Sequence, residues 1–208
     1  MTTMTTNVIR AGAPLGAARA AMILVHGRGA SAEGMLGFVD AFEADDIAYV
    51  APQARSGSWY PQSFMAPIAQ NEPHLSNALK TLSDVVADVE RQGVPPEKMV
   101  LLGFSQGACL ALEFAARNAR RFGGVVGLSG GLIGPEGTPR TYAGSLAATP
   151  VFLGCSDVDF HIPLKRVNES AEVLKTLGGT VTEIIYPGMG HTIVQDEVEH
   201  VKKILRGL

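Results

Sequence analysis

The chain has 208 residues, enough for one domain with a single sizeable core, and we expect one domain over 1–208 with disorder confined to the ends, at about 1–7. Hydrophobic residues make up 46% and charged residues 18%, a balance typical of a compact soluble protein. The 17 basic and 20 acidic residues form no block of like charge, so we expect no nucleic-acid partner.

Membrane insertion is also disfavoured. No apolar stretch approaches the roughly 18 residues that a membrane-spanning helix needs. The segment 1–16 lacks an apolar core of signal-peptide length. We therefore expect a cytoplasmic protein with no membrane span, and the sequence leaves a homodimer open.

Short apolar runs alternate with helical patterns along the chain. Within most runs the residues are continuously apolar and do not alternate with polar ones, which predicts strands buried on both faces of a parallel sheet. They lie at about 22–26, 47–51, 99–104, 124–129, 150–155 and 181–186. Helices are predicted at about 73–92 and 163–177, after Ser105, and from about 195 onward. This alternation predicts an α/β fold, with helices on both faces of a mostly parallel sheet.

Ser105 is the candidate nucleophile. It is the centre of Gly103-Phe104-Ser105-Gln106-Gly107, between a strand-like run and a helical segment. A Gly-x-Ser-x-Gly turn in this context strains the serine backbone and exposes its hydroxyl above the sheet. A Cβ at either flanking glycine would collide with a neighbouring strand or helix. The bare pentapeptide also arises by chance in a chain with 24 glycines, so the context carries the prediction.

Three further segments lie where an acyl-transfer enzyme needs them. The loop His26-Gly27-Arg28-Gly29 follows the first apolar run, and its amides are suited to a developing oxyanion. Asp157 and Asp159 follow a later strand, and His191 lies in a glycine-flanked loop after the last one. The order Ser, Asp, His is that of α/β-hydrolases and differs from the chymotrypsin and subtilisin orders.

A serine hydroxyl is a weak nucleophile near neutral pH and needs a base. We favour His191 among the five histidines, because of its loop. His161 competes, but the helix that begins at Pro163 is expected to point it away. Structural or solvent-exposed roles are expected for His26, His74 and His200.

The acid is either Asp157 or Asp159, since an aspartate beside the base fixes its tautomer and stabilises the imidazolium. We favour Asp159, which leads from the loop into the following helix, and Asp157 is expected to cap or brace the turn. For the oxyanion hole we expect the backbone amides of Arg28 and Gln106, with both side chains incidental to the chemistry. We expect the Arg28 side chain to be solvated or salt-bridged, and contact with an anionic substrate group is the alternative.

Two long loops, at 53–72 and 130–147, are candidates for the substrate pocket. The first loop carries Trp59, Tyr60 and Phe64 and is called the aromatic loop below. A loop of this composition forms either the wall of a cleft or a satellite of the core. The expected pocket residues are Trp59, Tyr60, Phe64, Leu132, Phe160 and Met189. Cys109 and Cys155 lack metal-ligand spacing to a histidine, so we expect two small core residues, no metal and no cofactor.

Together the motifs resemble the phospholipase/carboxylesterase family of α/β-hydrolases, which includes carboxylesterases and acyl-protein thioesterases. The resemblance covers nearly the whole chain and rests on the segments 24–29, 103–107, 157–163 and 187–191. It implies an α/β-hydrolase fold without a large lid, a triad of Ser105, Asp159 and His191, and oxyanion amides on Arg28 and Gln106. Two positions depart from the family pattern. Phe160 stands where the family often has a proline after the catalytic aspartate, and Arg28 stands where an apolar residue is common in the acyl-protein thioesterases.

We therefore expect a serine hydrolase that cleaves small-molecule carboxylic esters, with short or medium acyl chains, through an acyl-enzyme intermediate. An acyl thioesterase or a lysophospholipase would use the same machinery, and only the pocket separates them. A non-catalytic binding protein on a hydrolase fold is the alternative from another class. Such a protein would normally show a broken triad, whereas all three members are present here.

Overall fold

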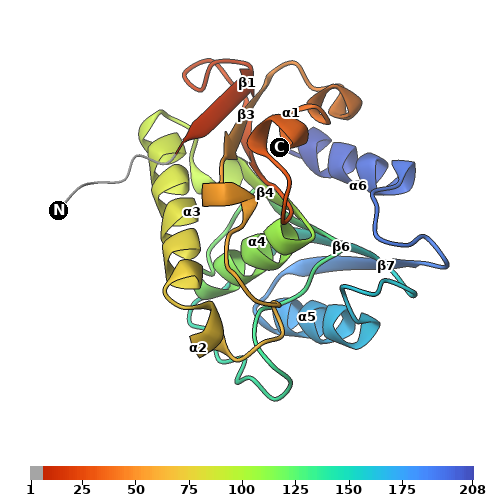
Figure 1. Ribbon diagram of the computed structural model, residues 1–208. Coiled ribbons are helices and arrows are strands. Elements are labelled where there is room, and N and C mark those ends of the chain that lie inside the picture. The colour runs from red at the N-terminus through yellow and green to blue at the C-terminus, as the bar shows by residue number, and fades with distance from the viewer. Residues whose placement is uncertain (1–6) are drawn as a thin grey trace.

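The computed structural model describes residues 7–208, built around a seven-stranded sheet with the order β1-β3-β2-β4-β5-β6-β7 (Figure 1). β1 pairs antiparallel with β3, and every other neighbouring pair is parallel. The strands are β1 (Val8–Gly12), β2 (Ala20–Val25), β3 (Ile47–Pro52), β4 (Met99–Phe104), β5 (Gly124–Leu128), β6 (Pro150–Ser156) and β7 (Thr180–Tyr186).

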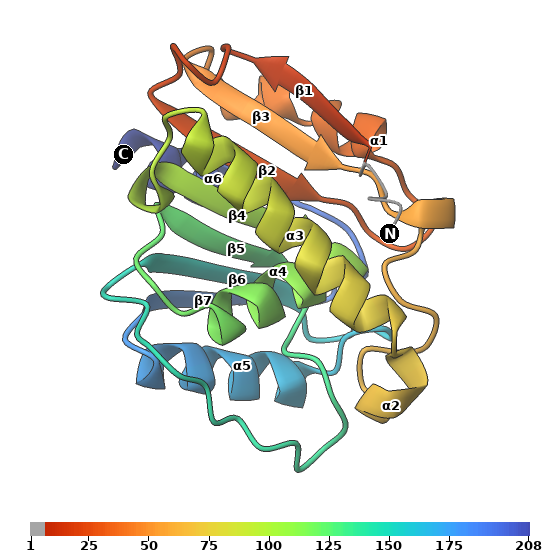
Figure 2. The same cartoon turned by 90° about the vertical axis from the view of Figure 1, so that its left-hand side faces the viewer.

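Helices cover both faces of this sheet. The α-helices are α1 (Ala32–Leu36), α2 (Ile68–Asn71), α3 (His74–Arg91), α4 (Gln106–Arg117), α5 (Leu164–Thr176) and α6 (Gln195–Arg206). Short 3-10 helices span Val39–Phe42, Arg55–Gly57 and Pro96–Lys98. Figure 2 shows α3, α4 and α5 in front of the sheet, with α1 and α6 behind it.

The sheet divides the core into two layers, because successive side chains of a strand point to opposite faces. Ile23 and Leu101 pack in the layer that holds α3, α4 and α5. Their neighbours Met22 and Val100 pack in the other layer, with residues of α1 and α6. Strands buried on both faces explain the continuous apolar runs of the sequence.

All six predicted strands and the four predicted helices are confirmed, within a few residues at their ends. β1 was not predicted. It is an edge strand that pairs on one side only and is half exposed, so it lacks a continuous apolar run. The disorder expected at about 1–7 falls outside the described residues except at Asn7, whose carbonyl accepts a hydrogen bond from Gln53 N at 2.8 Å. In residues 7–208, no helix is long and apolar enough to cross a membrane.

Glycines allow α4 to lie very close to β2 and β4. A Cβ on Gly103 would lie 2.2 Å from the Gly107 carbonyl oxygen, and one on Gly107 would lie 2.0 Å from the Val25 carbonyl oxygen. Any larger residue at either position would force the backbones apart. The collision expected from the pentapeptide is thus confirmed, and the close packing brings the start of α4 to the carboxyl edge of the sheet.

Candidate active site

Ser105 joins β4 to α4 in a strained conformation, with φ 56° and ψ −121°. A residue with a Cβ rarely adopts this geometry, and it persists only where the surroundings hold it. Here the Ser105 amide donates to the Leu128 carbonyl at 2.9 Å, and its carbonyl accepts from Cys109 N at 3.0 Å. These contacts hold the turn at the carboxyl edge of the sheet.

Three side chains from distant segments meet at this turn. Ser105 Oγ lies 2.9 Å from His191 Nε2, and His191 Nδ1 lies 2.6 Å from Asp159 Oδ2. The Asp159 side chain is fully buried, and its Oδ1 accepts from the amides of His161 and Ile162 at 2.8 and 3.2 Å. An ionised carboxylate can only accept, so the Nδ1–H tautomer of His191 donates to it, which leaves Nε2 to accept from the serine hydroxyl.

The neighbouring aspartate has a different partner. Asp157 Oδ1 accepts from Gly188 N at 2.8 Å, and Ser156 Oγ accepts from Gly190 N at 3.2 Å. Both contacts brace the loop that carries His191. Asp157 therefore braces a turn, the role that the sequence analysis expected for it.

His161 lies beside His191 and does not point away as the sequence suggested. The two rings meet edge to face, with 4.9 Å between their centroids. The following helix, α5, begins after Pro163, but His161 precedes that turn and stays at the site. Only His191 contacts the Ser105 hydroxyl among the histidines of residues 7–208.

His26 organises the glycine-rich loop. It is fully buried, with Nδ1 2.7 Å from the Gly27 carbonyl oxygen and Nε2 accepting from Ala54 N at 3.0 Å. Burial lowers the pKa of His26, which favours the neutral ring that this pattern requires. The ring thereby joins the loop to the segment after β3, the structural role expected of it.

The backbone N–H groups of Arg28 and Gln106 have no protein acceptor in the described part of the chain. Gln106 is the first residue of α4, where an N–H has no partner within the helix. Both N–H groups are therefore free to bind a developing oxyanion, and the start of α4 further favours negative charge beside Gln106.

The side chains of these two residues also hold the loop that carries Trp59 and Tyr60, a structural role that the sequence did not predict. Gln106 Oε1 accepts from Trp59 N at 3.0 Å, and Gln106 Nε2 donates to the Tyr60 carbonyl at 2.8 Å. The Arg28 guanidinium donates three hydrogen bonds to the same loop. Sequence spacing could not reveal these contacts, because they join residues 30 or more positions apart.

A cleft of about 420 Å³ opens over Ser105. It is lined by Arg28, Tyr60, Pro61, Gln62, Ser63, Phe64, Ser105, Gln106, Cys109, His161, Ile162 and His191. Of the six expected pocket residues, it contains Tyr60 and Phe64. Cys109, which the sequence did not suggest for the pocket, lies one helical turn after Ser105, and that spacing was the available signal.

The other four expected pocket residues lie elsewhere. Trp59 is only 5% exposed and packs in the core, where its Nε1 donates to the His26 carbonyl at 2.8 Å. Leu132 is completely buried, Phe160 is 99% exposed, and Met189 is half-buried outside the lining. All three aromatic residues of this loop are thus buried in one core cluster, and Tyr60 and Phe64 also line the cleft, a difference that composition alone cannot resolve.

Neither cysteine is suited to act as a nucleophile. Cys109 and Cys155 are free and buried, and burial raises the pKa of each thiol to about 12. Both thiols therefore remain neutral near pH 7. Since the thiolate is the reactive form, neither is an effective nucleophile. They are the small core residues that the sequence predicted.

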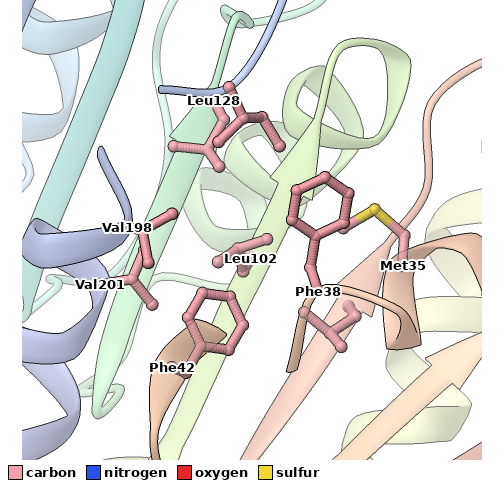
Figure 3. A pocket seen from close by; sticks show the side chains of 9 residues that line it. Met35, Phe38, Phe42, Leu102, Leu128, Val198 and Val201 are labelled. Carbon is pink, nitrogen blue, oxygen red and sulfur yellow. The ribbon is translucent and has the colours of Figure 1, made fainter. Parts of the chain in front are cut away.

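A second hollow lies on the opposite face of the sheet, between the α1 region and α6 (Figure 3). Its walls are entirely apolar and include Met35, Phe42 and Val201. With a volume of about 10 Å³ it has room for about one water molecule. The cleft at Ser105 is therefore the candidate substrate site.

The fold and the serine elbow at the sheet edge define an α/β-hydrolase without a large lid. A family model described as Phospholipase/Carboxylesterase matches residues 7–208, and the chain belongs to this family of hydrolases.

Individual relatives agree with this family. A phospholipase/carboxylesterase from Dyadobacter fermentans is 43% identical, and its solved structure has a TM-score of 0.94 with 99% of both chains covered. Esterase PE8 is 25% identical, with a TM-score of 0.83 over 98% of this chain and 99% of that chain. Acyl-protein thioesterase 1 of Gibberella zeae is 28% identical over 90% of this chain and 89% of that protein.

Proposed function

We propose that the protein is a serine hydrolase that cleaves carboxylic esters through an acyl-enzyme intermediate. Ser105 is the nucleophile, His191 the general base and acid, and Asp159 the carboxylate that orients the imidazole. The observation that carries this proposal is the continuous contact from Ser105 Oγ through both ring nitrogens of His191 to the buried Asp159. An adjacent base activates a serine in this arrangement.

In the acylation half, Ser105 Oγ attacks the ester carbonyl carbon as its proton passes to His191 Nε2. The carbonyl oxygen becomes an oxyanion, which the amides of Arg28 and Gln106 stabilise. When the carbon–oxygen bond to the alcohol breaks, protonated His191 donates its proton to the leaving oxygen. The products are free alcohol and acyl-Ser105.

In the deacylation half, His191 takes a proton from water, whose oxygen attacks the acyl carbon. The second tetrahedral intermediate collapses with return of the proton to Ser105 Oγ, which releases the carboxylic acid. Asp159 stabilises the imidazolium in both halves and keeps its own charge throughout.

The cleft supports a short or medium acyl chain. Phe64 and Ile162 are apolar residues of its lining, and each buried methylene of the substrate contributes up to about 0.8 kcal/mol. The value of kcat/KM should rise with acyl length until the chain fills the cleft, and then fall.

Acyl thioester cleavage is the second candidate, because four curated relatives at 24–28% identity are named acyl-protein thioesterase 1. A lysophospholipase would use the same chemistry. Parallel series of p-nitrophenyl esters and acyl thioesters of graded chain length separate these activities by their kcat/KM. Cytoplasmic location, a homodimer and the absence of a nucleic-acid partner stay predictions.

Labelling with a fluorophosphonate probe tests the central assignment. The wild-type protein should be labelled on Ser105, and Ser105→Ala should lose both the label and several orders of magnitude in kcat. Ser63→Ala is the matched control, since Ser63 also lines the cleft but lies on another loop, and it should keep the label. Labelling that persists in Ser105→Ala would refute the proposal.

A further inference from the structure

The guanidinium of Arg28 forms part of the cleft wall. It donates from Nη1 to the Pro61 carbonyl at 2.9 Å and from Nη2 to the Gln62 carbonyl at 2.7 Å. Its Cζ lies over the Tyr60 ring, 6.0 Å from the centroid. Since Tyr60, Pro61 and Gln62 all line the cleft, these contacts fix the positive charge at its edge.

This charge is not neutralised by the protein. No carboxylate of residues 7–208 lies within 4.0 Å of the Arg28 guanidinium, whereas Arg140 and Arg166 both pair with Glu169. The partners of Arg28 are two carbonyls and the Ser58 hydroxyl, all uncharged. Three of the five guanidinium N–H donors are used, which leaves two for a ligand.

The rest of the cleft lining adds no negative charge. Among the described residues that line the cleft, Arg28 is the one arginine and there is no lysine, aspartate or glutamate, and Asp159 is buried behind His191. A cleft with one sign of charge attracts the opposite charge in its substrate. The Arg28 amide is one of the two oxyanion donors of the proposed function, so the guanidinium lies within one side-chain length of that amide.

We propose that Arg28 selects esters that carry an anionic group, such as a carboxylate, a few bonds from the scissile carbonyl. The half-esters of dicarboxylic acids are one such substrate class. This inference rests on the proposed function. The anion belongs to either the acyl or the alcohol part, and the recognising chemistry, a charge-assisted hydrogen bond to a positioned guanidinium, is the same in both cases.

Two matched pairs of esters test this. The first compares 4-nitrophenyl hydrogen glutarate with its neutral methyl ester, so the anion is in the acyl part. The second compares 4-carboxyphenyl butyrate with its neutral methyl ester, so the anion is in the alcohol part. For each pair, the measured quantity is kcat/KM of the anionic ester divided by kcat/KM of the neutral one.

In wild type this ratio should decrease with rising ionic strength, because salt screens the attraction. In Arg28→Gln it should fall by about 5- to 30-fold for one pair, and that pair identifies which part carries the anion. Arg28→Lys keeps the charge and should retain most of the ratio. Arg55→Gln is the control, since Arg55 is an exposed arginine outside the cleft lining, and its ratio should equal that of wild type.

If Arg28 only holds the loop, Arg28→Gln lowers kcat/KM for both members of each pair, the ratio stays constant and the inference is overturned. A wild-type ratio that is insensitive to salt overturns it even if Arg28→Gln does not fold. Failure of the proposed function is distinct, because wild type would then hydrolyse neither ester and Ser105 would take no fluorophosphonate label.

Discussion

Asp157 and Asp159 lie two positions apart after β6, yet they act on the His191 loop in different ways. Asp159 Oδ2 lies 2.6 Å from the imidazole, whereas Asp157 Oδ1 accepts a hydrogen bond from the backbone of Gly188 at 2.8 Å. One carboxylate thus contacts the ring, and the other holds the loop on which the ring is carried.

Asp159→Asn should therefore lower kcat by roughly 10³- to 10⁴-fold, because an amide no longer selects the Nδ1–H tautomer or stabilises the imidazolium. Asp157→Asn keeps an oxygen acceptor for Gly188 N and should cost far less. Steady-state rates with a p-nitrophenyl ester give the ranking, with circular dichroism as the check on folding. The opposite ranking would assign the orienting role to Asp157.

His191→Ala should abolish turnover, since Ser105 loses the group that accepts its proton. His161→Ala should keep most of the activity, because His161 contacts the His191 ring and not the serine hydroxyl. The same ester assay measures both variants. Loss of turnover in His161→Ala with normal activity in His191→Ala would exchange the two assignments.

Trp59→Ala should lower the free energy of unfolding by about 3–5 kcal/mol, the usual cost of deleting a large buried aromatic side chain. It also removes the hydrogen bond to the His26 carbonyl. Urea denaturation measures the change. Phe160→Ala is the control, since the Phe160 side chain is 99% exposed and its removal should change stability by less than about 0.5 kcal/mol. A normal stability with an altered acyl-length optimum in Trp59→Ala would instead place Trp59 in the pocket.

Glu197 should make stability depend on pH. Burial raises its pKa from 4.5 to about 7, and its Oε1 has no hydrogen-bond partner in residues 7–208, although its Oε2 accepts from Val194 N at 2.9 Å. The folded state therefore holds a proton that the unfolded chain loses near pH 4.5. The associated stability is present below pH 4.5 and is lost as pH rises through 7, by at most about 3 kcal/mol.

Urea denaturation from pH 5 to 8 checks this. Glu197→Gln, which stays neutral, should gain stability relative to wild type over that range. Glu199→Gln is the contrast on the same helix, because Lys202 holds the pKa of Glu199 below its ordinary value, so the stability difference between wild type and Glu199→Gln should stay constant from pH 5 to 8. A constant difference between wild type and Glu197→Gln across this range would show that Glu197 is not buried in its neutral form.

Local patterns in the sequence were sufficient for six of the seven strands, four of the α-helices and the turn at Ser105. Buried parallel strands require continuous apolar runs, and the tight turn requires glycines at 103 and 107. Each of these features therefore has a pattern within a few neighbouring residues of the sequence. β1 has no such pattern, because this edge strand is half exposed and tolerates Arg10 in its centre.

Only the tertiary structure decided which of two aspartates contacts His191, and whether Trp59 belongs to the core or the cleft. It also assigned the Gln106 and Arg28 side chains to holding the aromatic loop. Each of these depends on the approach of segments about 30 or more residues apart, set by how the loops pack at the sheet edge. The chemistry that a residue can perform depends on its type and its immediate neighbours in the sequence. Its partner is determined by packing, because contacts between distant segments depend on how the whole core is packed.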